Sequence, residues 1–180
     1  MNRSKKWVSM FAAIHLGSVQ DSSCMATRLC SMRFHICASP SHLGKHGKPE
    51  TPRHISQCEC LLFPRREHNL NWLFRDKSGE VQEVTINGRC LVTNSEVIRR
   101  CALAGMGLAL LPEWLVEADI RSGKLLPLFE EFEGTATDFY SAVWILHPSR
   151  EYMPLRARVF IEQLTSSIAG NVDSQVLTHP

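Results

Sequence analysis

The sequence has no uninterrupted apolar run of the roughly 18 residues needed to cross a bilayer. It also lacks an excess of charge of one sign, because 20 basic and 18 acidic side chains leave the 180-residue chain with a formal net charge of +2. So small an excess cannot neutralise many phosphates, and the chain is not expected to bind nucleic acid by itself. Hydrophobic residues make up 44% and charged residues 21%, a balance that excludes intrinsic disorder and indicates one ordinary domain or two small lobes.

A complete disulfide framework is also missing. The chain has seven cysteines at irregular spacings, an odd number that favours reduced thiols in a cytoplasm. The basic start, Met1–Lys6, and the apolar stretch Trp7–Leu16 have the outline of a secretory signal. Ser9 and His15 interrupt that stretch, and no convincing small-x-small cleavage site follows it. The sequence therefore predicts a cytoplasmic protein.

No catalytic constellation is recognisable in the sequence. Asp21, Ser22 and His35 are the residue types of a hydrolase triad, but the G-x-S-x-G turn that exposes such a serine is absent. Gly105 and Gly107 lack the third glycine of a dinucleotide-binding loop and precede a predicted strand, which indicates a helix stop and a tight turn. We therefore expect neither an enzyme nor a bound cofactor.

A group of potential metal ligands lies in the first third of the chain. His42 and His46 are four residues apart on a predicted helix, and His54, Cys58 and Cys60 follow. Structural zinc sites usually contain cysteine pairs at C-x2-C spacing, which this segment lacks. We interpret these residues as surface histidines and small buried thiols, so no metal is expected.

Hydrophobic patterns of strand and helix period alternate along the chain, which is typical of an α/β domain. Thr93 and Glu96 form the best helix start, a capping box in which each side chain satisfies an amide of the first turn. Glu130–Gly134 is acidic and is interpreted as a solvated loop. Strands are predicted at 11–16, 33–38, 60–63, 72–75, 81–86, 90–92, 108–111, 125–129 and 139–146, with 72–75 and 81–86 paired as a hairpin. Helices are predicted in a short turn ending near Leu29, at 40–47, from Thr93 to Gly105, at 113–121 and after Pro154, with a polar tail beyond Gly170.

Several short motifs occur in a fixed order between about residues 11 and 166. The most characteristic is Ala104–Pro112, followed by Gly123–Leu125. The others are Ala12–Gly17, Asp21–Ser23, Ala26–Leu29, Ala38–Leu43, Gly47–Pro49, Pro52, Cys60–Phe63, Trp72–Phe74, Asn94, His147–Arg150, Pro154 and Phe160–Ile161. Each motif is weak alone, but in this order they resemble the C-terminal effector-sensing region of LysR-type transcriptional regulators.

This resemblance implies the α/β fold of type 2 periplasmic binding proteins, in which two lobes are joined by two crossing segments and hold a small molecule between them. The chain would contain one complete lobe and part of a second. We expect residues 1–38 to form the partial first lobe, 39–146 the second lobe, 147–170 the return to the first lobe, and 171–180 a tail. The family's N-terminal winged helix-turn-helix has no counterpart here, so the chain looks N-terminally truncated, and DNA would be bound only through the missing domain.

The candidate effector site lies at the start of the helix that follows the strand predicted at 90–92. In α/β lobes, ligands gather at the carboxyl ends of strands, where the amides and dipole of a following helix favour an anionic group such as a carboxylate. The resemblance adds an apolar wall and a closing segment from the partial lobe. The expected effector-binding residues are Thr93, Asn94 and Ser95 at the helix, Phe63 and Pro64 in the wall, and Gly17 and Ser18 in the partial lobe. The alternative is that Thr93 only caps its helix.

The resemblance thus predicts the effector-sensing and oligomerisation domain of a LysR-type regulator. In that family, ligand binding between the lobes shifts how a tetramer holds DNA. The expected partners are a small-molecule effector and further copies of the chain, with no membrane. The alternative is a periplasmic solute-binding protein of the same architecture, which the poor signal sequence disfavours. An enzyme on the same fold lacks support, because no paired carboxylates or activated nucleophile are present.

Overall fold

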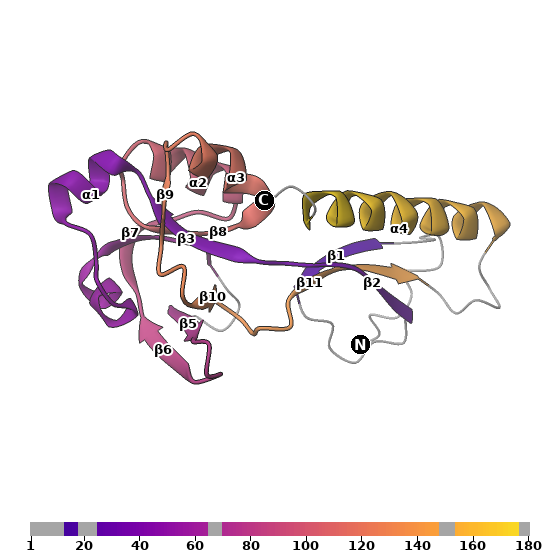
Figure 1. The fold of residues 1–180 in the computed structure, drawn as a ribbon, viewed down its shortest axis with the longest axis horizontal. Helices are drawn as coiled ribbons and strands as arrows, with labels where there is room; N and C mark the ends of the chain where they lie inside the picture. The colour runs from indigo at the N-terminus through magenta and orange to yellow at the C-terminus, as the bar shows by residue number, and fades with distance from the viewer. Residues whose placement is uncertain (1–12, 18–24, 65–69, 148–153, 177–180) are drawn as a thin grey trace, which may run out of the picture. The chain divides into compact units, whose positions relative to one another are not determined.

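The computed structural model describes residues 13–17, 25–64, 70–147 and 154–176 (Figure 1). The chain forms two compact units: Met1–Met32 together with Tyr140–Pro180, and Arg33–Phe139. These boundaries differ from the expected ones at residues 38 and 146, because the strand at 34–38 pairs within the second unit and the strand at 142–147 pairs within the first. Among the described residues, no helix is long and apolar enough to cross a membrane.

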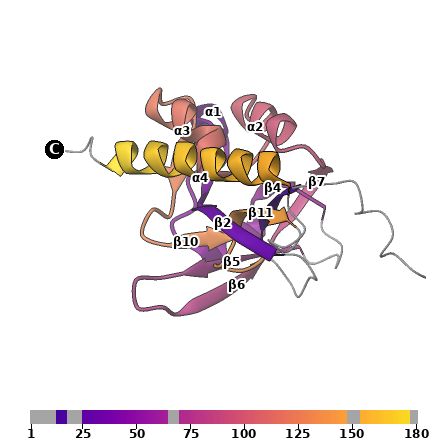
Figure 2. The same ribbon diagram turned by 90° about the vertical axis from the view of Figure 1, so that its right-hand side faces the viewer.

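The first unit is a three-stranded antiparallel sheet with one helix against it (Figures 1 and 2). Its strands lie in the order β1 (Ala13–Gly17), β11 (Ala142–His147) and β2 (Met25–Ser31), and α4 (Leu155–Val176) packs against β2. The strand predicted at 11–16 is found as Ala13–Gly17, so it ends one residue later than predicted, and residues 11 and 12 lie outside the described residues. The last helix predicted after Pro154 is confirmed.

Two local predictions for this unit are wrong. The helical turn expected to end near Leu29 is instead β2, whose hydrogen bonds go to β11. Pairing with a strand so distant in sequence outweighs the weak local preference for a helix, and the residues near Leu29 carry no signal of this pairing. In addition, α4 continues beyond Gly170, because a glycine weakens a helix by only about 1 kcal/mol and no proline follows before Pro180.

The second unit contains three further groups of strands. In the first, β3 (Phe34–Ala38) lies between β8 (Ala109–Pro112) and β9 (Leu126–Leu128), antiparallel to both. In the next, β4 (Glu59–Leu62) runs parallel to β7 (Asn87–Leu91). The last is the predicted hairpin, β5 (Asn71–Arg75) with β6 (Val81–Thr85), to which β10 (Glu133–Thr135) adds on the other side of β5. Glu130–Gly134 is therefore not simply the solvated loop predicted, since its end pairs with β5 and Gly134 is buried.

Three α-helices and a short 3₁₀ helix, Pro52–Gln57, connect these strands. The first, α1 (Pro40–His46), begins with proline as predicted, and the side chain of Ser39 caps it. The others are α2 (Ser95–Leu103) and α3 (Glu113–Arg121). The predicted capping box at α2 is wrong by one residue. Asn94 is the cap, and its Oδ1 accepts the amides of Glu96 and Val97 at 2.9 and 3.3 Å.

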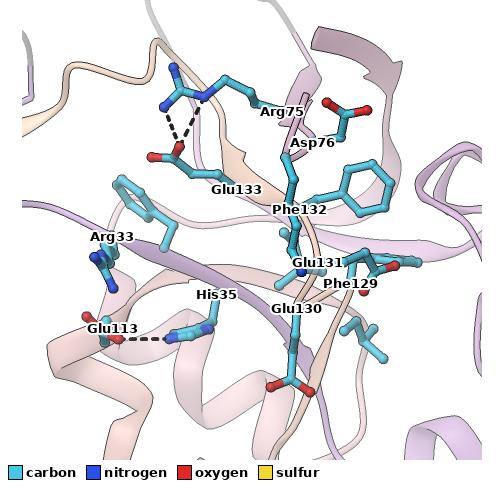
Figure 3. A pocket seen from close by; sticks show the side chains of 14 residues that line it. Arg33, His35, Arg75, Asp76, Glu113, Phe129, Glu130, Glu131, Phe132 and Glu133 are labelled. Carbon is cyan, nitrogen blue, oxygen red and sulfur yellow. Dashed lines mark hydrogen bonds and ion pairs between the residues drawn. The ribbon is translucent and has the colours of Figure 1, made fainter. Parts of the chain in front are cut away.

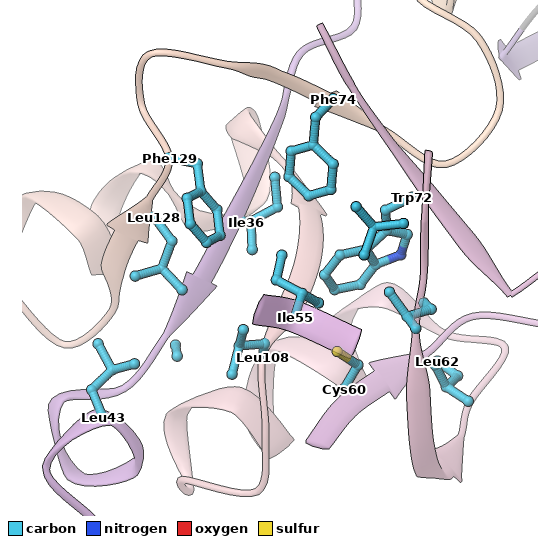
Figure 4. Close-up of a cluster of buried hydrophobic side chains, with 13 residues drawn as sticks. Ile36, Leu43, Ile55, Cys60, Leu62, Trp72, Phe74, Leu108, Leu128 and Phe129 are labelled. Atoms are coloured by element: carbon cyan, nitrogen blue, oxygen red, sulfur yellow. The ribbon is translucent and has the colours of Figure 1, made fainter. Parts of the chain in front are cut away.

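The core of the second unit consists of two apolar clusters on opposite faces of its strands. Ile36 of β3 and Cys60 of β4 belong to the first cluster (Figure 4), whereas the adjacent Cys37 and Leu61 belong to the second, beneath α2 and α3. This alternation follows from the two-residue period of a strand. Phe74 is fully buried in the first cluster and meets the rings of Phe129 and Phe132 edge to face.

The strand β4 is approached closely by two glycines. A β-carbon on Gly88 of β7 would lie 1.8 Å from the carbonyl oxygen of Cys60, and one on Gly107 would lie 2.7 Å from that of Glu59. Both distances are shorter than atoms can tolerate, so the backbone of β4 occupies the space that any side chain would need.

Candidate functional site

Five of the expected effector-binding residues, Phe63, Pro64, Thr93, Asn94 and Ser95, are called the effector segment. They lie at the carboxyl ends of β4 and β7. Because the two strands are parallel, with Leu62 opposite Leu91, the residues that follow them leave the sheet at the same edge. The amide of Val92 donates to the carbonyl of Leu62 at 2.9 Å, which continues the pairing to the end of both strands. Phe63 and Thr93 are the next residues, so the structure brings the predicted apolar wall to the predicted helix start.

The side chains at this edge are open to solvent. Phe63 is 43% exposed, Thr93 and Asn94 are exposed, and Pro64 and Ser95 are half-buried. Beside Phe63 lies an apolar hollow of about 20 Å³, lined by residues that include Leu62 and Trp72. A hollow of this size holds about one water molecule and no organic ligand.

The start of α2 offers fewer donors than the sequence predicts. Asn94 Oδ1 occupies the amides of Glu96 and Val97, so the amide and hydroxyl of Ser95 are the donors left in the first turn. Glu96 adds a carboxylate there, and the hydrogen bond from Arg100, with the nearby charge of Arg99, holds the pKa of Glu96 below its usual range. The arginines also compensate its negative charge at the end where an anion would bind.

An ion pair holds α2 against α3. Arg99 of α2 donates to Asp119 of α3, whose carboxylate is almost completely buried, and also to Glu96 at 3.2 Å. Since charge-assisted hydrogen bonds are directional, this bridge fixes the helix that carries the effector segment.

Two expected site residues, Gly17 and Ser18, come from the partial lobe. Gly17 ends β1 in the first unit, and its carbonyl accepts a hydrogen bond from Trp144 Nε1 at 2.8 Å. Ser18 lies outside the described residues. Within the second unit, the structure brings Phe63 and Pro64 of the expected set to the same edge as Thr93, Asn94 and Ser95.

A larger cavity, of about 480 Å³, lies within the second unit, where the sequence predicted no site (Figure 3). It is formed by the start of β3, the β5–β6 turn, the start of α3 and residues 128–133. One ion pair and one hydrogen bond line it: Arg75 pairs with Glu133, with its Nε 3.1 Å from Glu133 Oε2, and His35 Nε2 lies 3.3 Å from Glu113 Oε1. No spacing pattern could have revealed the cavity, because these partners are 78 and 58 residues apart in sequence.

The potential metal ligands are dispersed. Among the described residues, no three histidine, cysteine or acidic side chains come together as a metal site. His42 is buried, contrary to the prediction of a surface histidine, because its Nδ1 hydrogen-bonds the carbonyl of Gly105 at 3.1 Å. Cys60 is buried as predicted, and burial raises the pKa values of the Cys37 and Cys60 thiols to about 12, so neither is a nucleophile near neutral pH.

Comparison with known proteins identifies the class. The family model described as the LysR substrate binding domain matches residues 12–169, and the chain belongs to this family. It accordingly has the type 2 periplasmic-binding-protein-like fold, as predicted.

Particular relatives are transcriptional regulators. The regulator CrgA of Neisseria meningitidis is 32% identical over 160 residues, which are 89% of this chain and 52% of CrgA. PtxR of Pseudomonas aeruginosa is 31% identical over 152 residues, 84% of this chain and 47% of PtxR. The chain thus spans about half the length of the curated relatives that it matches.

Solved structures agree with this assignment. The regulatory domain of CrgA from Neisseria meningitidis superposes with a TM-score of 0.72 at 30% identity, covering 88% of this chain and 75% of that domain. Full-length AphB of Vibrio cholerae gives a TM-score of 0.73 at 20% identity, covering 87% of this chain and 51% of AphB, which supports the fold alone.

Proposed function

We propose that this chain is the effector-binding part of a LysR-type transcriptional regulator. The match of residues 12–169 to the LysR substrate binding domain is the observation that carries the proposal. In this proposal, a small molecule bound by the chain changes how the DNA-binding domain of the regulator holds DNA, and further copies of the chain assemble in a cytoplasm. Such a change requires different affinities of the ligand for two arrangements.

The ligand proposed for the effector segment is a small carboxylate. The Ser95 amide and hydroxyl, at the positive end of the α2 dipole, are the donors that would receive it. The exposed ring of Phe63 would contact the apolar part, while Thr93, Asn94 and Pro64 would border the ligand. Gly17 and Ser18 remain the proposed contribution of the first unit.

The alternative of a periplasmic solute-binding protein is not favoured, because the matched relatives are transcriptional regulators. The same relatives are consistent with a protein that catalyses no reaction.

Isothermal calorimetry with a panel of small aliphatic and aromatic carboxylates tests the proposal. A carboxylate that binds the wild-type chain should bind the Ser95→Glu variant at least tenfold more weakly, because the new carboxylate repels it. Ser167→Glu, an exposed serine of α4, is the matched control and should leave the affinity unchanged. If the ligand binds Ser95→Glu with wild-type affinity in a folded protein, the site assignment is wrong. If no carboxylate binds, the ligand class is wrong.

A further inference from the structure

The 480 Å³ cavity of the second unit shares no residue with the proposed effector segment. Its volume lies within the range of about 300–1,000 Å³ that is typical of small-molecule sites. Its lining includes four apolar side chains: Ile36, Leu128 and Phe129 are almost completely buried, and Phe132 is half-buried. In Figure 3, Arg33 lies on one side of the cavity and Phe129 and Phe132 on the other.

Several charged groups around the cavity are already compensated. Arg75 pairs with Glu133 and has the ring of Phe139 4.3 Å from its guanidinium, and His35 hydrogen-bonds Glu113. Asp76 is engaged in its own turn, where its Oδ1 accepts the amides of Ser78 and Glu80 at 2.8 and 2.9 Å. None of these groups needs a ligand.

Four charged side chains of the lining have no partner among the described residues. Two are cationic, Arg33 and Lys77, and two are anionic, Glu130 and Glu131. A ligand with a charge of only one sign would compensate the two side chains of opposite charge. The other two side chains would stay uncompensated or would repel the ligand. A ligand with one charge of each sign and an apolar body matches the whole lining, including its apolar side chains.

The backbone of the lining is also unusual. Phe129 has a φ of 57°, and it is the only residue other than glycine with a positive φ among the described residues. A bulky side chain in this conformation is strained, and its ring is held by packing against Phe74 with centroids 5.9 Å apart. This part of the lining is therefore kept in a fixed shape by its packing against the core.

We propose that this cavity is a second ligand site, which binds a zwitterion with an apolar side chain such as an apolar α-amino acid. The carboxylate is received by Arg33 and Lys77, the ammonium group by Glu130 and Glu131, and the apolar side chain by Phe129 and Phe132. The site selects for both charges at once, whereas the proposed effector segment selects for a carboxylate.

Three probes of nearly equal shape separate the two charges: L-phenylalanine, 3-phenylpropanoate, which lacks the ammonium group, and 2-phenylethylamine, which lacks the carboxylate. In calorimetric titrations of the full chain, phenylalanine should bind about tenfold more tightly than either of the others, because each exposed charge-assisted contact is lost separately. Equal affinities, or no binding of phenylalanine, would overturn the proposal.

Variants test which side chains of the cavity bind each charge of the ligand. Arg33→Gln should weaken phenylalanine and 3-phenylpropanoate about tenfold and leave 2-phenylethylamine unchanged. The double variant Glu130→Gln, Glu131→Gln should weaken the binding of phenylalanine and 2-phenylethylamine and leave the binding of 3-phenylpropanoate unchanged. These positions are exposed, so the variants should fold.

Exposed residues elsewhere, Arg53→Gln and Glu50→Gln, are the matched controls and should change no affinity. Ser95→Glu should also leave phenylalanine binding intact, so that failure of the proposed effector site is distinguishable from failure of this one. If either cavity variant weakens the binding of all three probes equally, the assignment of the ligand's two charges to these side chains is wrong.

Discussion

The two units differ in how their strands are buried. In the second unit, β3 and β4 send successive side chains into two separate clusters, so these strands are packed on both faces. In the first unit, β1 alternates between half-buried and exposed residues, and Ile14 and Leu16 are 63% and 55% exposed. Leu155, Val159 and Phe160 of α4 are exposed as well. The second unit therefore has a core of its own, whereas much of the apolar surface of the first unit is still in contact with water.

The largest expected effect compares one phenylalanine from each unit. Phe74→Ala removes a fully buried ring from the first cluster and should lower the free energy of unfolding by about 4 kcal/mol. Phe160→Ala removes a ring that is 59% exposed and should change it by less than about 0.5 kcal/mol. Urea denaturation measures both. Similar losses for the two variants would show that the units do not differ in packing as described.

A smaller effect is expected from two glycines within the second unit. Gly88→Ala places a methyl group against the carbonyl of Cys60 and should cost about 3 kcal/mol, because β4 and β7 must move apart. Gly44→Ala in α1 meets nothing within 4 Å and should stabilise the protein by about 0.5 kcal/mol. Thermal unfolding followed by circular dichroism shows whether each substitution lowers or raises the stability of the protein. A neutral Gly88→Ala would mean that the strand pair tolerates the displacement.

A third comparison concerns the exposed strand β1 of the first unit, where the expected effect on stability is small. Ile14→Ser with Leu16→Ser should change the free energy of unfolding by less than about 1 kcal/mol. The same double variant should reduce self-association, because it removes two neighbouring apolar side chains from the surface of β1. Light scattering over a dilution series measures this. Unchanged association would place the contact between copies elsewhere.

Whether the sequence could predict an element depends on how close along the chain the residues that determine it lie. The β5–β6 hairpin, α1 and α3 are bounded by local turn and proline signals, and the structure has them where they were predicted. The identity of β2 and the start of β10 depend on strands far away in sequence, so no local pattern reported them. At α2, Thr93 and Asn94 are both good caps, and only the backbone decides between them.

The candidate site divides in the same way. Thr93 was predicted from its helix start and Phe63 from the family resemblance. The parallel pairing of β4 with β7 puts both residues just beyond the carboxyl ends of these strands, and their role in binding stays a prediction. The cavity could not be predicted, because its lining comes from four separate parts of the chain. The roles of Gly17 and Ser18 stay predictions.

The close approach of Gly88 and Gly107 to β4 also restricts how this protein can vary. At most positions a mutation is tolerated or not according to the properties of the new side chain, but at these two the space is already occupied by the backbone of β4. Every replacement, however small or polar, meets the same carbonyl oxygens, so these positions distinguish glycine from everything else. In a library of random variants selected for folding, both codons should therefore stay fixed while the buried apolar residues around them exchange for one another.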